Sequence, residues 1–197
     1  MIADIVLSHQ NEQEFATMAK RLGYDTLILL SENHGKTNTQ INTQNRAEIN
    51  CIPLTILEPN VFLKKKWFTP VCVQSSESDR AVAERGCSMM WGFEFLQHKD
   101  FTHQRGSGLN HVLCEIAQQK NIVIAFSLQH AITAKNPGII LGRMAQNIRL
   151  CQKYKVPVMI GSFARTPQEM RSPKDLQALF MELGLRPEFL KKNCDFT

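Results

Sequence analysis

The histidines and carboxylates of this sequence are the residues most able to hold a divalent metal ion. The candidates near the ends of predicted strands are His9, His34, His98 and His103, with Asp4, Glu32, Glu94 and Asp100. A catalytic zinc or manganese ion needs three or more protein ligands and an open position for water. The first predicted strand carries no H-x-H pair, and His98 and His103 share a predicted loop without a typical ligand spacing. The pattern therefore does not favour a metal-dependent phosphoesterase.

Nucleophilic catalysis is predicted even less strongly. The sequence has no G-x-S-x-G motif, and it supplies no recognisable base for Ser162 or Ser172. Ser172 precedes Pro173 and stands three residues before Asp175, which is typical of a helix cap. The six cysteines are scattered without a C-x-x-C pair, so neither a zinc site nor a disulfide framework is expected.

The basic residues indicate a different chemistry, the binding of phosphate. The chain has 23 Lys and Arg against 18 Asp and Glu, a net charge of +5. From position 135 to 171 there is a local excess of +6, larger than the charge of the whole chain. Its members are Lys135, Arg143, Arg149, Lys153, Lys155, Arg165 and Arg171, with Glu169 as the single acid. Two interpretations are open, a solvated helix face and a phosphate-binding surface.

A second basic cluster, residues 64–66, consists of three lysines directly followed by Trp67 and Phe68. In proteins that bind single-stranded nucleic acid, aromatic rings stack on bases while lysines hold phosphates. The alternative is the end of a helix whose apolar side is packed against the core.

The segment 108–127 determines the fold class that must position these residues. Leu109, Leu113 and Ile116 have helical spacing, and residues 121–127 form an apolar, β-branched run. A strand that is apolar on both faces is typical of a parallel sheet covered on both sides.

The same alternation of strands and helices runs through the whole chain. The patterns predict strands at 2–8, 26–31, 50–57, 70–74, 88–92, 121–127 and 156–161. They predict helices at 12–22, 78–85, in the first half of 108–127, at 138–154 and at 173–183, with a turn at Pro59-Asn60 and a polar loop at 93–107. In the helix 138–154, Met144, Ile148 and Cys151 should face inward. Its outward positions should be Arg143, Gln146, Arg149 and Lys153.

Such alternation indicates right-handed βαβ units. The dinucleotide fingerprint and the phosphate-loop motif are both absent, which disfavours open-sheet nucleotide folds. We therefore predict an α/β fold with one TIM-like (β/α) barrel over residues 1–197. The length is short for such a barrel, so the last strand after Glu188 is expected to be incomplete and 190–197 to form a short tail.

In a β/α barrel, the loops that leave the strands lead into helix N-termini on one common face, where backbone N–H groups favour phosphate. Arg80, Arg105, His111 and Arg171 all fall at such positions. These four residues would thus place donors on one face, as expected of a surface that binds a phosphate backbone. An ordinary surface charge remains the alternative for each residue alone.

Several stretches together resemble archaeal ribonuclease P protein component 3. They are 108–113 (GLNHVL), 121–128 ending in AFSL, 147–158 (NIRLCQKYKVPV), 160–162 (IGS) and 170–176 (MRSPKDL). The resemblance covers about residues 80–184 by sequence and is only topological before that. It implies a barrel related to the metal-dependent PHP phosphoesterases, and the missing H-x-H pair agrees with a loss of their metal chemistry.

The resemblance also implies a role. The chain would be a non-catalytic, RNA-binding subunit that supports the catalytic RNA in removing the 5′ leader from precursor tRNA. It would bind no cofactor, because the Mg²⁺ belongs to the RNA subunit. Its partners would be the ribonuclease P RNA, precursor tRNA, ribonuclease P protein component 2 and the other protein subunits. The residues that match the RNA-facing positions of the family are Arg80, Arg105, His111, Lys120, Lys153 and Arg171.

Two alternatives to this role stay open. One is a stand-alone PHP-type metal-dependent phosphoesterase, and the other is a barrel that mainly binds another protein. His111 and Lys120 stand at opposite ends of one predicted helix, so they should lie at opposite rims of the barrel. The longest apolar runs are too short to cross a bilayer, so we expect a cytoplasmic protein without a membrane partner.

Overall fold

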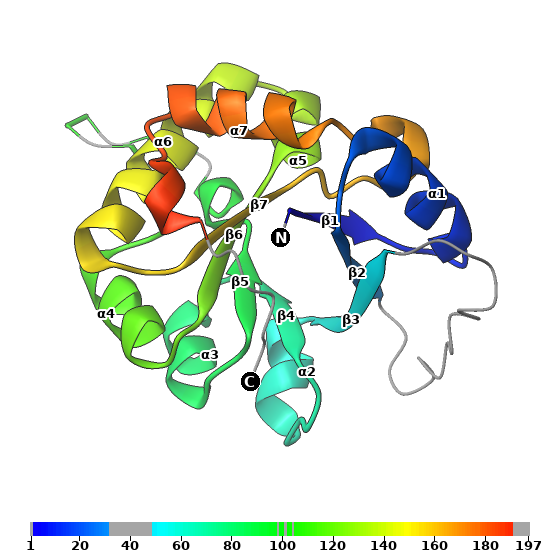
Figure 1. The fold of residues 1–197 in the computed structure, drawn as a ribbon. Coiled ribbons are helices and arrows are strands. Elements are labelled where there is room, and N and C mark those ends of the chain that lie inside the picture. The colour runs from blue at the N-terminus through cyan, green and yellow to red at the C-terminus, as the bar shows by residue number, and fades with distance from the viewer. Residues whose placement is uncertain (1, 32–48, 98, 101, 104, 191–197) are drawn as a thin grey trace.

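A computed structural model of the chain describes residues 2–31, 49–97, 99–100, 102–103 and 105–190. Seven parallel strands form one sheet whose spatial order is the order of the sequence (Figure 1). The strands are β1 (Ala3–Leu7), β2 (Thr26–Ser31), β3 (Asn50–Leu57), β4 (Val71–Gln74), β5 (Met89–Trp91), β6 (Val123–Ser127) and β7 (Val158–Gly161). Each strand is hydrogen-bonded to the next in parallel register, so the sheet curves into a barrel.

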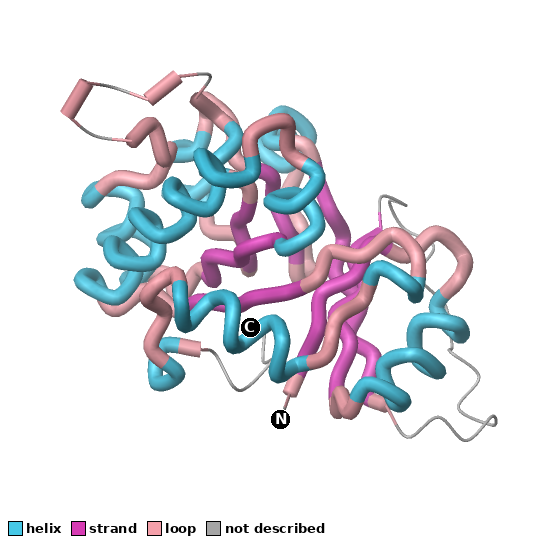
Figure 2. The backbone as a smooth tube through the Cα atoms, turned by 90° about the horizontal axis from the view of Figure 1, so that it is seen from above, coloured by secondary structure: helices cyan, strands magenta, loops and turns pink. Residues whose placement is uncertain are grey.

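The helices surround this sheet on its outer side, as two perpendicular views show (Figures 1 and 2). They are α1 (Glu12–Leu22), α2 (Pro59–Lys64), α3 (Asp79–Arg85), α4 (His111–Gln119), α5 (Leu128–Thr133), α6 (Pro137–Tyr154) and α7 (Pro173–Glu182). Three short 3₁₀ helices complete the set: η1 (Phe93–Phe95), η2 (Pro167–Glu169) and η3 (Pro187–Phe189). Within the described part of the chain, no helix is long and apolar enough to cross a membrane.

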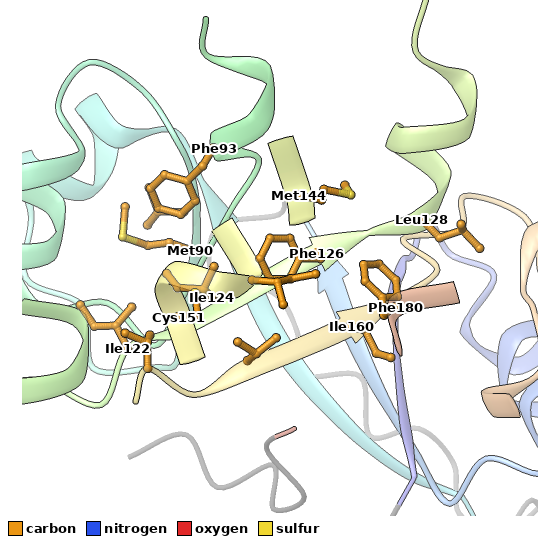
Figure 3. Close-up of a cluster of buried hydrophobic side chains, with 14 of the residues drawn as sticks. Met90, Phe93, Ile122, Ile124, Phe126, Leu128, Met144, Cys151, Ile160 and Phe180 are labelled. Atoms are coloured by element: carbon orange, nitrogen blue, oxygen red, sulfur yellow. The ribbon is translucent and has the colours of Figure 1, made fainter. Parts of the chain in front are cut away.

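Successive strand residues alternate between two apolar layers, as the pleat of a strand requires. One layer fills the inside of the barrel and is built from strand residues such as Ile5, Ile28 and Met89, with Phe163 at its end. The other layer lies between the strands and the helices, where Phe126 packs beside Phe180 of α7 (Figure 3). Because both faces of the sheet are buried, the strands are apolar runs, and the predicted TIM-like α/β barrel is confirmed.

The barrel closes between β1 and the end of β7 without a continuous ladder. The Phe163 N–H donates to the Ile5 carbonyl at 2.7 Å, and the Leu7 N–H donates to the Ala164 carbonyl at 2.8 Å. Next to these bonds, Asp4 Oδ1 accepts the Ser162 N–H at 2.6 Å and Oδ2 accepts the Ser162 hydroxyl at 2.7 Å. Burial raises the pKa of Asp4 to about 6. A carboxyl group thus joins the first and last strands where backbone pairing stops.

The described residues include only the beginning of the predicted, incomplete last strand. Val158 of β7 forms one isolated parallel bridge with Leu190, and the rest of the predicted tail lies outside the described residues. The seam between β1 and β7 is therefore only partly sealed.

Two local predictions were wrong. Pro59-Asn60 is not a turn but the start of α2, because proline is favoured at the first helical position and Phe62 is buried one turn later. Helix α5 was not predicted: it begins directly after β6, with Ser127 as its cap and its side-chain oxygen accepting the His130 N–H. Its six residues are too few to show a periodic pattern.

Candidate nucleic-acid interface

Four of the predicted RNA-facing residues follow the carboxyl ends of strands, at the end of the barrel that we call the upper rim. Arg80 lies in α3 after β4, Arg105 lies between β5 and α4, His111 begins α4, and Arg171 precedes α7. All four are exposed. The structure therefore places these four residues at one end of the barrel, as the sequence predicts.

All three of these arginines already have partners within the chain: Arg105 Nη1 lies 3.9 Å from Asp100 Oδ2. Arg80 Nε donates to Glu84 Oε1 at 2.8 Å, one helical turn away and in solvent. Arg171 Nη1 donates to the backbone carbonyls of Gln168, Glu169 and Met170, at 3.0–3.3 Å. Arg171 therefore also caps η2, so its replacement would disturb this turn as well as any phosphate contact.

Arg105 lies against α6. It lines a small cleft of about 220 Å³ together with Gly142, Gln146 and Arg149. The Gln146 side-chain amide donates to the Arg105 carbonyl at 3.3 Å, and a Cβ at Gly142 would collide with the Arg105 guanidinium. The structure thus brings Arg105 beside Arg149, a residue that the sequence placed only among the outward positions of this helix.

Arg143, on the same helix, is buried, so the prediction that it faces outward was wrong. Only 3% of it is exposed. Its Nη1 donates to the carbonyls of Glu94 and Gln97, at 3.0 and 2.6 Å, and its Nε donates to Asp100 Oδ1 at 2.7 Å. The helical pattern predicted an exposed position because the covering loop, 93–107, lies outside the periodic element. Arg143 therefore holds this loop and is not available to RNA.

The described carboxylates and histidines that the sequence offered as metal ligands do not form a cluster. Among the described residues, no three His, Cys, Asp or Glu side chains could share a metal ion. His34, His98 and Glu32 lie outside the described residues. Asp4 is engaged at the seam, and Asp100 accepts the Gly106 N–H and the Arg143 side chain, which lower its pKa.

Glu94 is fully buried on the outer side of the sheet, and both of its carboxylate oxygens lack a hydrogen-bond partner within the described chain. Burial raises its pKa from 4.5 to about 7. The folded chain therefore holds a proton that the unfolded chain has lost between these two pH values. Because the unfolded state binds fewer protons, stability falls as pH rises through this window.

Replacing Glu94 with Met should therefore raise the free energy of unfolding by about 2 kcal/mol at pH 8, because an apolar side chain of similar length removes a buried charge. At pH 5 the gain should shrink, since the carboxyl group is then neutral. Chemical denaturation at both pH values measures this. The exposed Glu115→Met on α4 is the control, with an expected change within about 0.5 kcal/mol. Equal gains at both pH values would contradict the assignment of the proton to Glu94.

The remaining predicted residues, Lys120 and Lys153, end α4 and α6 and lie at the opposite end of the barrel, the lower rim. Lys153 is exposed, and its Nζ lies 5.4 Å from the ring centre of Tyr154. Lys120 lies beside Gly86, which follows α3. The prediction that His111 and Lys120 occupy opposite rims is confirmed.

Lys120 belongs to a hollow of about 820 Å³ at this rim, between the ends of α2, α3 and α4. We call it the lower-rim groove and define it by five of its lining residues: Lys66, Trp67, Phe68, Arg85 and Lys120. Three of these are cations, and none of the residues that line the hollow is acidic. The lysine–aromatic cluster of the sequence and Lys120 thus meet on one surface, although 52 positions separate Phe68 from Lys120.

Arg85 shapes this groove. Its Nη1 donates to the Leu63 carbonyl at 2.8 Å and its Nη2 donates to the Lys65 carbonyl at 2.6 Å, while the guanidinium carbon lies 5.7 Å from the centre of the Phe62 ring. These bonds fix the lysine segment against α3. From the sequence, Arg85 could be assigned only as the last residue of a helix. The helical pattern carries no information about its contact with Lys65, 20 positions earlier.

Helix energetics explain part of the charge in this groove. Cations at the C-terminus of a helix are favoured by its dipole, and Arg85 and Lys120 occupy such positions. The same effect cannot explain Phe68, whose residue surface is 96% exposed. A fully exposed aromatic ring among cations is the arrangement that stacks on an unpaired base while the cations neutralise phosphates.

Comparison with known proteins was made by sequence and by structure. Residues 98–195 match the sequence model of the family described as RNase P subunit p30. Ribonuclease P protein component 3 of Methanococcus maripaludis is 22% identical over 97% of this chain and 86% of its own length. The corresponding protein of Thermococcus gammatolerans is 36% identical, but over 52% of this chain and 46% of its own length.

The structural comparison covers more of the chain. A protein chain in a cryo-EM structure of archaeal ribonuclease P with mature tRNA superimposes with a TM-score of 0.77 at 16% identity. The superposition includes 95% of this chain and 84% of that one. It therefore extends the likeness in fold to the first half, which the family match does not reach. Through residues 98–195 the chain belongs to the RNase P subunit p30 family, and the resemblance predicted from its sequence is confirmed.

Proposed function

We propose that this chain is a protein subunit of ribonuclease P that binds the catalytic RNA and supports removal of the 5′ leader from precursor tRNA. The relatives named above are ribonuclease P proteins, which supports this role. The observation that carries the RNA-binding part is the lower-rim groove, where an exposed Phe68 lies among Lys66, Arg85 and Lys120. In this role the RNA cuts the precursor and the chain does not, which agrees with the absence of a three-ligand metal cluster among the described residues.

The mechanism is neutralisation of phosphate charge. A folded RNA brings phosphates close together, and their repulsion is relieved by bound Mg²⁺ or by protein cations. Lysines and arginines at both rims would let the RNA fold at a lower Mg²⁺ concentration. We further propose that ribonuclease P protein component 2 is its protein partner, that the Mg²⁺ is bound by the RNA, and that the complex works in the cytoplasm, where precursor tRNA is processed.

The proposed role predicts the activity of a reconstituted complex over a Mg²⁺ series. Adding the chain to the RNA subunit and the partner protein should shift cleavage of precursor tRNA to lower Mg²⁺. The chain alone, with Mn²⁺ or Zn²⁺ supplied, should show no phosphatase or nuclease activity. An unchanged Mg²⁺ dependence would contradict the proposal, and activity of the chain alone would favour the stand-alone phosphoesterase. A complex whose assembly needs the chain although the chain never binds RNA would favour the protein-binding alternative.

The groove predicts separable effects of charge and stacking on RNA affinity. Lys120→Gln should weaken binding and reduce the slope of log K against log salt by about one, because one phosphate contact is lost. Phe68→Ala should weaken binding about tenfold without changing this slope, because stacking carries no charge. Filter binding of the RNA subunit at several salt concentrations measures both.

Lys20→Gln is the matched control for this measurement. It removes the same charge from the exposed end of α1, which lies on the opposite side of the barrel from α3 (Figure 1). A loss with Lys20→Gln equal to that with Lys120→Gln would mean that binding follows net charge, and the groove would then have no specific role.

A further inference from the structure

A second cavity, of about 450 Å³, lies at the upper rim. Its lining includes the last residues of three strands, Leu57, Gln74 and Trp91, together with His130 of α5 and Arg165 after β7. These residues come from five successive units of the barrel and converge on one point. In barrels of this kind, ligands bind at this end, where the loops leave the strands. None of the RNA-facing residues predicted from the sequence lines this cavity.

Arg165 gives the cavity its charge. Its side chain is exposed and forms no ion pair with any residue that the structure describes. Its main chain is nevertheless fixed, because its N–H donates to Glu169 Oε2 at 2.7 Å and its carbonyl accepts the side-chain amide of Asn11 at 3.4 Å. An exposed guanidinium with free donors, carried on a fixed backbone, suits a single phosphate group.

The inner end of the cavity is aromatic. Trp91 is 4% exposed, and its indole Nε1 has no hydrogen-bond partner among the described residues. The His130 ring lies 4.8 Å from the Trp91 ring, and the Phe163 ring lies 5.1 Å from it, measured between centroids. Phe163 reaches this place with a left-handed backbone, at φ 51°, which is costly for a residue with a bulky side chain.

His130 adds one more polar group. Its Nδ1 is 2.6 Å from Ser127 Oγ, which leaves Nε2 available to a ligand. The exposed Gln74 contributes an amide that can donate and accept. The lining thus combines one cation, an unpaired indole N–H, an imidazole and an amide. Among the described lining residues Glu58 is the single carboxylate, and no described cluster of His, Cys, Asp and Glu offers the three ligands of a catalytic metal ion.

We propose that this cavity binds a nucleoside monophosphate unit, with Arg165 at the phosphate and Gln74, Trp91 and His130 at the base. The single guanidinium matches one phosphate better than a di- or triphosphate, and the flat polar and aromatic groups match a base better than an inorganic anion. The unit is either a free nucleotide or the phosphorylated end of an RNA chain. The inference does not rest on the lower-rim groove, which lies at the opposite end of the barrel.

The sequence offers a direct probe, because it contains two tryptophans and Trp67→Phe leaves Trp91 as the single one. In this background, titration with adenosine 5′-monophosphate should change Trp91 fluorescence with saturation. Adenosine and inorganic phosphate should each bind at least tenfold more weakly. Calorimetric titration of the unmodified chain should give the same affinity.

Arg165→Gln should weaken nucleotide binding at least tenfold, whereas Arg21→Gln, at the far end of α1, should leave it unchanged. A short 5′-phosphorylated oligoribonucleotide distinguishes the two sources: equal binding identifies an RNA end, and exclusion identifies a free nucleotide. The proposal is overturned if neither method detects saturable binding, if adenosine or phosphate binds as tightly as the nucleotide, or if Arg165→Gln binds normally.

Discussion

Replacing Arg143 with Met is expected to lower the free energy of unfolding by about 3 kcal/mol, because it removes a buried guanidinium and leaves the acceptors that it satisfies without their donor. The guanidinium satisfies the carbonyls of Glu94 and Gln97 and pairs with Asp100. Methionine fills a similar volume but donates no hydrogen bond, so these acceptors lose their partner. The loop 93–107 should then detach from α6, and Arg105 should lose its position beside Arg149.

Urea denaturation measures the loss of stability, and limited proteolysis within the loop measures its release. Arg149→Met is the matched control: it removes the same group from an exposed position on the same helix, and its expected cost is within about 0.5 kcal/mol. Equal losses in the two variants would show that helix propensity or net charge, and not the buried network, explains the effect.

Arg143 also shows where prediction from the sequence reaches its limit. The strands were predicted well because a parallel barrel buries both faces of each strand, so Ile28 and Leu29 are both apolar although they point to opposite layers. The exposure of Arg143 depends instead on a loop 40 or more positions away. Periodicity describes an element and its two sides, but it carries no information on a loop that folds over it.

The same limit applies to the candidate sites: the position of a residue within its element could be predicted, but its contacts with distant segments could not. His111 and Lys120 could be assigned to opposite rims, because the direction of a helix in a βαβ unit determines where its ends lie. The lysine–aromatic cluster was visible as a motif, yet its meeting with Arg85 and Lys120 depends on how three helix ends pack. Arg165 was counted among the basic residues of its region, but its place in the lining of a cavity at the barrel mouth is a property of the fold alone.

The second large loss of stability is expected from replacing Asp4. Asp4→Ala should lower the free energy of unfolding by about 4 kcal/mol at pH 4, because in a fully buried site it leaves the Ser162 and Ile5 N–H groups without their acceptor and the Ser162 hydroxyl with only the Ile5 carbonyl at 3.4 Å. The loss should be largest near pH 4 and should shrink toward pH 8, because the stability of the unmodified chain falls over this range while the alanine variant has no carboxyl group to titrate. Denaturant unfolding from pH 4 to 8 measures it.

Asp4→Asn separates the charge of this carboxyl group from its hydrogen bonds. Its amide oxygen can accept both N–H groups and its NH₂ can donate to the Ser162 oxygen, so the cost at pH 4 should be small. Burial raises the pKa of Asp4 from 3.8 to about 6, so between these values the folded state of the unmodified chain binds a proton that the unfolded state has lost. Its stability therefore falls as pH rises through this window and levels off above it.

The asparagine variant should lack this decline and become more stable than the unmodified chain above pH 6. The difference between the two stability curves isolates Asp4, because Glu94 and every other titrating group contribute to both. A difference that stays constant from pH 4 to 8 would show that Asp4 does not change its protonation at the seam. The closing contact of the barrel would then be a permanently charged carboxylate, stabilised by the two strands that it joins.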